Sequence, residues 1–339
     1  MKTLSYEDAF QVLLLQAAGE GRGAALFGDS LACARGAVPP FLVGKRFPNV
    51  YFEHPLAGKP FLDVTVLLAQ LDPGTRIDSP AAGDHGAMMD WYADVRRRYS
   101  RASFGFELDT KEAMLPAAGV HFQPRADIEL VRPFCEAAGE PERAELYLSQ
   151  AARMPEDWQL SFFGMFRGRP SSPLRICGYL DDVEKNACSA SPTRLAAMFD
   201  AIGFTSYDSA MLAQVATLME ATPGTVDFQF DVFPDSTLGD TFAIDMQFGI
   251  EQPEAVQFSF EQGAGSRVMR LLESMGAADG RWRVAIRSAF ARAIPMRLAD
   301  EGEGLVAFTL MPQWAKARWA GGSLQASKLY HLARARLLD

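Results

Sequence analysis

The segment TVDFQFDVFPDSTLGDTFAIDMQFGI (residues 225–250) alternates apolar and polar side chains on both sides of a Pro-Asp-Ser turn. Successive side chains of a β-strand point to opposite faces. Val226, Phe228 and Phe230 would therefore share one face of the first strand, with its polar residues on the other. Alternation that is interrupted only by a short turn is typical of a β-hairpin. The segment predicts a hairpin with one apolar face and one polar face.

Four other stretches have the same character, and amphipathic helical patterns separate most of them. The five expected hairpins cover residues 47–68, 102–123, 159–180, 225–249 and 304–332. Helices are expected over 5–18, 84–99, 126–138, 140–153, 192–202, 206–221, 264–275 and 280–293, and a Gly/Ala/Pro-rich connection over 19–40. No linker rich in Ser, Gly or Pro separates these units. We therefore expect one domain over residues 1–339, built from about five repeats of two strands and two helices.

Ten strands with one apolar and one polar face fit two architectures. An open α+β sheet would carry the helices on its apolar face and expose its polar face to water. A closed sheet would bury the same apolar face under the helices and turn the polar face into a lumen. Ten strands enclose more space than a few side chains can fill. We expect the closed form, an α+β fold with ten antiparallel strands around a solvent-filled lumen and the helices outside.

Composition narrows the classes of partner. The 339 residues are 48% hydrophobic and include 24 Phe, which indicates a large lipophilic interior. A net charge of −9 without a basic run argues against nucleic-acid binding. The four cysteines are scattered without a CxxC pair, which favours free thiols in a reducing cytosol. No apolar run approaches the roughly 20 residues of a membrane span, and the N-terminus reads as an amphipathic helix. We expect a cytoplasmic protein with no nucleic-acid or membrane partner.

Three short motifs within this cadence carry a resemblance to a known family. Val50-Tyr51-Phe52-Glu53 precedes a Gly-containing turn, Gly119-Val120-His121 precedes Arg125, and Ser327-Lys328-Leu329-Tyr330 lies near the C-terminus. In this order they resemble the ABBA prenyltransferases, and most of all the cyanobactin-type peptide prenyltransferases of RiPP natural-product biosynthesis. The third hairpin departs from the family pattern, because Cys177 stands where a tyrosine would be expected.

The resemblance implies an enzyme that moves a C5 or C10 prenyl group from dimethylallyl or geranyl diphosphate to an aromatic or heteroatom side chain of a cyclic or linear peptide. Such an electrophilic alkylation needs cations for the diphosphate, aromatic faces around the allylic cation and a carboxylate base. Strand parity places Glu53 towards the lumen as the catalytic base; an exposed strand-end glutamate is the alternative. The diphosphate candidates are Arg125, Arg175, Lys316, Arg318, Lys328 and His121, with Tyr179 and Tyr330 shielding the prenyl cation; Lys59, Arg167 and Arg169 rank lower because they lie at turns.

An acidic set on the polar face of the fourth hairpin has no single interpretation. Asp227, Asp231 and Asp245 could contact a basic group of the acceptor, hold a magnesium–diphosphate complex, or be solvated at a barrel rim. A DDxxD motif is absent, so Mg²⁺ could accompany the diphosphate but is not required, and no tightly bound cofactor is expected.

Two other functions fit the same sequence. The acceptor could be a small aromatic metabolite or free tryptophan, for which a narrow barrel mouth would suffice. Alternatively, the chain could be a non-catalytic barrel that binds a peptide or a lipophilic ligand. In that case, changing Glu53 or Lys328 would leave ligand binding unchanged.

Overall fold

The fold is built on one continuous twelve-stranded sheet, described here from a computed structural model that covers residues 3–68, 71–78, 85–99, 102–110, 116–121, 128–155, 158–169, 172–235 and 237–338. Within these residues the strands are β1 (Thr3–Leu4), β2 (Asn49–Pro55), β3 (Asp63–Leu68), β4 (Ser103–Leu108), β5 (Ala117–His121), β6 (Gln159–Met165), β7 (Leu174–Leu180), β8 (Val226–Val232), β9 (Leu238–Gln247), β10 (Phe290–Leu298), β11 (Gly302–Ala320) and β12 (Ser323–Leu338). All five expected hairpins are present, as β2–β3, β4–β5, β6–β7, β8–β9 and β11–β12.

The sheet closes on itself through β11. This strand of 19 residues pairs along its length with β12, and its two halves have different second partners. Residues 302–310 pair with β10, whereas residues 314–320 pair with β9. Since β12 also pairs with β2, the β11–β12 hairpin connects β9 to β2 and closes the series that runs from β2 to β9. Among the described residues, ten antiparallel strands complete this ring, and β10 and β1 extend the sheet outside it. The expected closed barrel is confirmed, and an open sheet is excluded.

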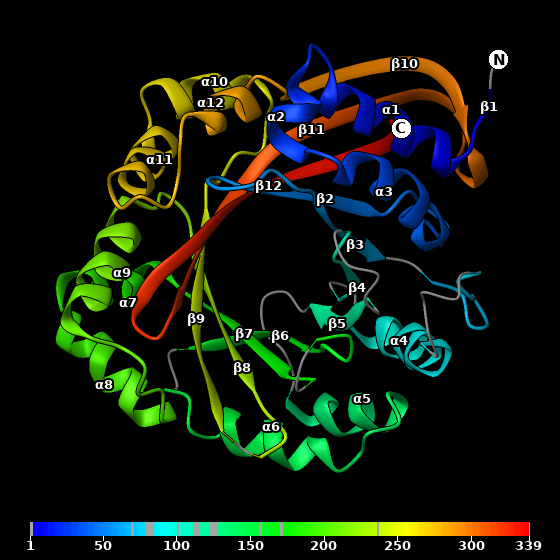
Figure 1. Cartoon of the computed structure of the whole chain (residues 1–339). Coiled ribbons are helices and arrows are strands. Elements are labelled where there is room, and N and C mark those ends of the chain that lie inside the picture. Colours follow the sequence, from blue (N-terminus) through cyan, green and yellow to red (C-terminus); the bar gives the residue numbers. More distant parts are fainter. Residues whose placement is uncertain are drawn as a thin grey trace.

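Helices surround the barrel (Figure 1). Within the described ranges they are α1 (Tyr6–Ala18), α2 (Arg22–Phe27), α3 (Ser30–Ala37), α4 (Gly86–Arg98), α5 (Val131–Ala137), α6 (Arg143–Ala151), α7 (Asp182–Ala190), α8 (Pro192–Ile202), α9 (Ser209–Ala221), α10 (Glu254–Glu261), α11 (Ala264–Ser274) and α12 (Arg281–Ile286). The first begins with a capping box, in which Ser5 and Asp8 each bond the other's backbone N–H. The side chain of Asp208 caps α9 in a related way, accepting a hydrogen bond from the Met211 N–H.

The core lies between the barrel wall and the helices. Phe52, Phe104 and Phe106 point outwards from β2 and β4, and each is at most 1% exposed. Their neighbours along the same strands point inwards and are mostly polar, as strand alternation requires. The tip of the β11–β12 hairpin is fixed to the helical layer, because the Trp319 indole N–H donates to Gln214 of α9 at 2.9 Å. The chain therefore buries its apolar strand faces outside the barrel and leaves a polar lumen inside, as expected.

Several sequence-based boundaries were wrong. The helix expected over 280–293 ends at Ile286, and residues 290–298 form β10 instead. This strand contains Pro295 and is largely solvent-exposed, both typical of a strand at a sheet edge. The connection expected over 19–40 contains α2 and α3, and α7 and α10 were not expected.

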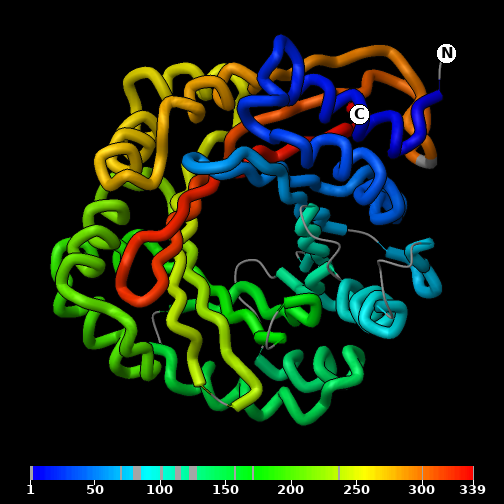
Figure 2. Tube along the Cα trace, viewed as in Figure 1, coloured from blue at the N-terminus to red at the C-terminus, as the bar shows by residue number. Residues whose placement is uncertain are grey.

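The first described strand and the end of β12 lie on the same side of the molecule, where β1 pairs with β10 (Figure 2).

Candidate functional site

A cavity of about 390 Å³ lies inside the barrel. It is lined mainly by inward-facing polar side chains from strands far apart in sequence. The charged and aromatic lining residues used below are Glu53, Glu107, Arg169, Arg175, Asp231, Lys316, Arg318, Lys328 and Tyr330. With Asp240, the cavity is lined by five cationic residues and four carboxylates, so it is suited to a polar ligand that carries an anionic group rather than to a purely apolar one.

Glu53 is held in a defined position on the wall of this cavity. It is 6% exposed, and its Oε1 accepts a hydrogen bond of 2.5 Å from the Thr65 hydroxyl of the neighbouring strand β3. Its Oε2 lies 3.3 Å from the ammonium of Lys328 on the other neighbouring strand, β12. The residue opposite Glu53 in the β2–β12 register is Tyr330. Both neighbouring strands therefore orient the carboxylate.

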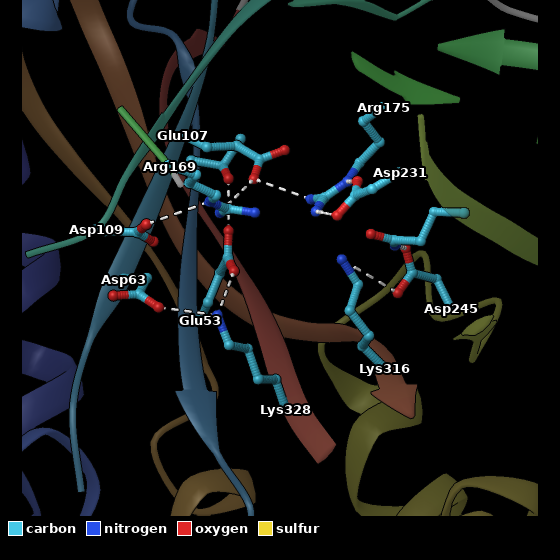
Figure 3. Close-up of polar contacts among 12 residues, drawn as sticks. Glu53, Asp63, Glu107, Asp109, Arg169, Arg175, Asp231, Asp245, Lys316 and Lys328 are labelled. Carbon is cyan, nitrogen blue, oxygen red and sulfur yellow. Dashed lines mark hydrogen bonds and ion pairs between the residues drawn. The ribbon is translucent and has the colours of Figure 1, made fainter. Parts of the chain in front are cut away.

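Lys328 joins two carboxylates, because its ammonium also lies 2.8 Å from Oδ2 of Asp63 (Figure 3). Burial acts to raise the pKa of Glu53, but the charges of Lys328 and Lys316 outweigh it and lower the pKa below its usual range. Burial raises the pKa of Asp63, and the nearby Glu53 charge adds to this in spite of Lys328. Glu53 stays ionised at neutral pH, as a base must.

Two arginines form a second cluster in the same cavity. The Arg175 guanidinium and the Asp231 carboxylate make a bidentate pair, with Nε–Oδ1 and Nη2–Oδ2 distances of 2.8 and 3.2 Å. The guanidinium carbons of Arg169 and Arg175 lie 4.3 and 4.0 Å from the centre of one aromatic ring, that of Phe166. One carboxylate oxygen, Oε2 of Glu107, lies 3.6 Å from both arginines. Burial alone would lower the pKa of Arg175, but the charge of Asp231 outweighs the effect of burial and raises this pKa.

Two further cations complete the set. Arg318 lines the cavity near the arginine cluster: burial lowers its pKa, and the neighbouring charge of Arg175 lowers it further. The Lys316 ammonium lies 3.6 Å from Oδ1 of Asp245 and 5.0 Å from the centre of the Tyr330 ring. Lys316 therefore lies between the Asp245 carboxylate and the Tyr330 ring.

The acidic set divides into two kinds of residue. Asp231 belongs to Arg175, as described above. Asp227 and Asp245 face each other across β8 and β9, and each accepts a hydrogen bond from a glutamine amide, Gln247 at 2.6 Å and Gln229 at 3.2 Å. Burial, reinforced by the Asp245 charge, raises the pKa of Asp227 to about 7. Burial likewise raises that of Asp245 to about 6. Both carboxylates therefore take up a proton at a higher pH than an ordinary aspartate does.

An aromatic stack forms the wall beside Lys316. The Tyr330 ring lies parallel to Trp314, with centroids 4.8 Å apart and an interplanar angle of 18°. Tyr51 packs on the other side of Trp314 at 4.7 Å. Burial raises the pKa of Tyr330 well above its usual value, so its ring presents a neutral face towards the cavity. Such a face can stabilise a nearby cation.

The structure brings most of the sequence-predicted residues together and leaves some apart. Glu53, Arg175, Lys316, Arg318, Lys328 and Tyr330 line one cavity. Tyr179 is on the inner face, but its hydroxyl donates a hydrogen bond to Oε1 of Gln159. The ring centroids of His121 and Phe162 lie 4.3 Å apart, and burial lowers the pKa of His121 to about 4, so this imidazole is neutral at pH 7. Arg125 lies outside the described residues.

Sequence reasoning ranked Arg169 too low and missed four residues of the two clusters. Arg169 lies in the turn between β6 and β7, and the β6–β7 hairpin brings it beside Arg175. Arg167, which was ranked with it, pairs instead with Glu140 at 2.6 Å. The missed residues are Asp63, Thr65, Glu107 and Asp109, the last of which has its Oδ2 3.5 Å from Nε of Arg169. The first three alternate with apolar side chains in β3 and β4, so the parity argument that found Glu53 could have found them too.

Among the described residues, no group of three or more His, Cys, Asp or Glu side chains is arranged to hold a metal ion. None of the helices in the described part of the chain is long and apolar enough to cross a membrane.

Comparison with known proteins identifies the fold. No known protein family matches the sequence, and no curated protein does. Solved structures do match. A 5-dimethylallyltryptophan synthase from Streptomyces coelicolor superposes with a TM-score of 0.53 at 9% identity over 97% of each chain. The prenyltransferase PriB, in its apo form, has a TM-score of 0.51 at 10% identity, with coverage of 98% of this chain and 96% of PriB.

A second PriB structure, a ternary complex with L-tryptophan and dimethylallyl thiolodiphosphate, has a TM-score of 0.54 at 12% identity over the same shares of the two chains. These neighbours cover nearly the whole chain. They confirm that it has the ABBA prenyltransferase fold, as the hairpin cadence predicted. The resemblance to the cyanobactin-type subgroup stays a prediction.

Proposed function

We propose that this protein is a prenyltransferase that carries an allylic group from a diphosphate donor to a nucleophilic acceptor inside its barrel. The observation that carries the proposal is the composition of one cavity. An ionised, buried glutamate, a cluster of arginines and a neutral aromatic face line the same space of about 390 Å³.

The continuous sheet from β1 to β12 supports the expectation that residues 1–339 form one domain.

The arginine cluster would bind the diphosphate. Arg169 and Arg175 present two guanidiniums over one Phe166 ring, and Arg318 and Lys316 lie in the same cavity. Guanidiniums bind phosphate oxygens through paired hydrogen bonds, and their charge stabilises diphosphate as a leaving group. The C–O bond of the donor breaks, the electron pair leaves with the diphosphate, and an allylic cation remains. The Tyr330 face shields that cation and stabilises it by a cation–π interaction.

Glu53 would complete the reaction. The acceptor attacks the allylic carbon and forms the new bond, and the proton that the acceptor loses passes to Glu53. Thr65 and Lys328 hold the carboxylate in position, and the two lysines keep it ionised. Lys328 is less free for the diphosphate than the sequence suggested, because Asp63 and Glu53 already share its ammonium.

For the acceptor we favour an aromatic or heteroatom side chain of a peptide, with a C5 or C10 donor. The motifs of the resemblance support this choice, because Glu53, Lys328 and Tyr330 all lie on the cavity. Free tryptophan is the second candidate, since a similar solved structure holds L-tryptophan together with a dimethylallyl analogue. Mg²⁺ could enter with the diphosphate, and Asp231 and Asp245, which pair with Arg175 and Lys316, would then be candidates to contact it.

The experiment is a mass-spectrometric screen. The protein is incubated with dimethylallyl or geranyl diphosphate, with and without Mg²⁺, and with tryptophan or a panel of linear and cyclic peptides bearing Trp, Tyr, His or Arg. We expect one prenyl mass increment on an acceptor and release of diphosphate in equal amount. Increments on peptides alone would select the peptide function, and increments on tryptophan alone the second candidate. Ligand binding without any product or diphosphate release would instead favour a non-catalytic barrel.

A further inference from the structure

The arginine cluster already contains an anion, supplied by the protein itself. Oε2 of Glu107 lies 3.6 Å from Arg169 and 3.6 Å from Arg175, between the two guanidiniums that share the Phe166 ring. All three charged residues line the cavity. Figure 3 shows the carboxylate of Glu107 with dashed lines to both arginines. A carboxylate oxygen therefore stands where an oxygen of a bound diphosphate would be expected.

The contacts of Glu107 are looser than those of its neighbour Asp231. The Asp231 carboxylate accepts two hydrogen bonds from Arg175, of 2.8 and 3.2 Å, and the Asp231 side chain is 15% exposed. Glu107 approaches each arginine only at ion-pair distance, and its side chain is 26% exposed. A partly solvated ion pair without a hydrogen bond contributes little free energy, so it can be exchanged at low cost. The two carboxylates thus have different tasks: Asp231 fixes Arg175, and Glu107 only neutralises it.

A charge in this place has opposite effects on the empty and the occupied cavity. Arg169, Arg175 and Arg318 lie close enough to lower the pKa of Arg318 by mutual repulsion, in addition to burial. In the empty cavity the Glu107 charge acts on Arg175, whose pKa it raises together with Asp231, and it shares Arg169 with Asp109, whose Oδ2 lies 3.5 Å from Nε. When a diphosphate brings its own negative charges to the same arginines, Glu107 becomes a like charge beside it. Because the Glu107 charge stabilises the empty cavity and destabilises the occupied one, it weakens diphosphate binding by the difference between these two free energies.

We propose that Glu107 is an internal counter-ion that competes with diphosphate for Arg169 and Arg175, and thereby limits how tightly the donor and the released diphosphate bind. The proposal rests on the proposed function, in which these arginines hold the diphosphate. Its consequence is unusual for a charged residue in a binding site, since removing the charge should improve binding. Slow release of diphosphate would then reduce turnover.

The test compares the full-length protein with Glu107→Gln by calorimetric titration with inorganic pyrophosphate. We expect Glu107→Gln to bind pyrophosphate about tenfold more tightly, because one like charge next to the ligand has gone. Asp231→Asn should bind it about tenfold more weakly, because Arg175 loses its bidentate anchor. Glu303→Gln is the matched control, since Glu303 pairs with Arg297 outside the barrel and is 56% exposed. Circular dichroism confirms that each variant is folded.

Steady-state kinetics with dimethylallyl diphosphate supply the second readout. In Glu107→Gln we expect the donor KM and kcat to fall together, whereas a merely structural residue would raise KM when changed. Pyrophosphate affinity that is unchanged or weaker in Glu107→Gln, with the wild type binding normally, would overturn this inference and leave the proposed function standing. Absence of pyrophosphate binding in the wild type and in every variant would instead overturn the proposed diphosphate site, and this inference with it.

Discussion

Two groups of charged side chains occupy the same barrel and are built differently. The first, which we call the base cluster, consists of Glu53, Asp63 and Lys328, and its cation lies 2.8 and 3.3 Å from two carboxylates that are at most 9% exposed. The second, the arginine cluster, has one tight pair, Arg175–Asp231 at 2.8 Å. Its other ion pairs are loose: Glu107 lies 3.6 Å from Arg169 and from Arg175, and Asp109 lies 3.5 Å from Arg169.

The difference matches two tasks. A proton acceptor must keep one position and one charge, and buried, short contacts provide that. A leaving-group site must release its ligand after each turnover, so its cations need partners that can be exchanged. The comparison suggests that the arginine cluster differs from the base cluster in having loose ion pairs beside its one tight pair, so that part of its positive charge can change partner. Four substitutions in addition to Glu107→Gln would break or sharpen this comparison.

The largest effect is expected from Glu53→Gln, which removes the proton acceptor and keeps the shape of the side chain. Loss of a positioned general base lowers the rate by about 10²–10⁴-fold. We expect product formation to fall by this factor in a mass-based assay, while pyrophosphate binds as in the wild type. Equal losses of both would mean that Glu53 belongs to the donor site, and the division into two clusters would be wrong.

A smaller loss is expected from Lys328→Met, which leaves Glu53 without its nearest cation. The pKa of Glu53 is lowered in the folded protein because the lysine charges outweigh burial. Without Lys328, burial would raise that pKa, so Glu53 would be protonated over part of the neutral range. We expect activity to fall about 10–100-fold at pH 7 and to recover as the pH rises. A pH–rate profile checks this: the acid limb should move to higher pH, and an unshifted limb would contradict the role given to Lys328.

Arg175→Ala should act on the other cluster. Removing a guanidinium that binds a phosphate group costs roughly tenfold or more in affinity. We expect the KM for dimethylallyl diphosphate to rise by about that factor, with the acid limb of the pH–rate profile unchanged. Arg167→Ala is a suitable control, because Arg167 pairs with Glu140 and does not line the cavity. A shifted acid limb in Arg175→Ala would show that the two clusters are not independent.

The smallest effect is expected from Asp227→Asn, a carboxylate that faces Asp245 and belongs to neither cluster. Burial raises the pKa of Asp227 from 3.8 to about 7 in the folded protein. An acid with a raised folded pKa favours the native state when protonated, so its contribution to stability is lost as the pH rises from about 4 to 7. Asp227→Asn should therefore match the wild type below about pH 4 and melt about 1–3 °C higher at pH 8. A difference in melting temperature that stays constant with pH would contradict the raised pKa.

Alternation along strands accounts for what the sequence could predict. It placed Glu53, Lys328 and Tyr330 on the inner face, and the closed barrel brings them to one cavity. The same alternation in β3 and β4 holds Asp63 and Glu107, which were overlooked because neither belongs to a motif. Arg169 could not be found in this way, since a residue at a turn has no strand parity. The misassigned strand β10 shows a related limit, because a half-exposed edge strand lacks a clear apolar period.

Ion-pair distances, by contrast, could not be predicted at all. The sequence offered Lys328 and Arg175 as equivalent diphosphate candidates. In the fold, Lys328 is shared by two buried carboxylates, whereas Arg175 has one firm partner and one loose one. The difference depends on which residue stands opposite in the neighbouring strand, Pro55 for Lys328 and Asp231 for Arg175, and thus on a register that only the closed sheet defines.

The central claim is that one cavity binds the diphosphate at the arginine cluster, holds the prenyl group against Tyr330 and places Glu53 where it can take the proton of the acceptor. A crystal structure of the protein with dimethylallyl thiolodiphosphate tests it most directly. We expect the diphosphate group to bond Arg169, Arg175 and Arg318, the prenyl group to lie against the Tyr330 face, and the Glu107 carboxylate to have moved away from the arginines. An analogue bound outside the barrel, or with its diphosphate at Lys328 and its prenyl group away from Tyr330, would contradict the account.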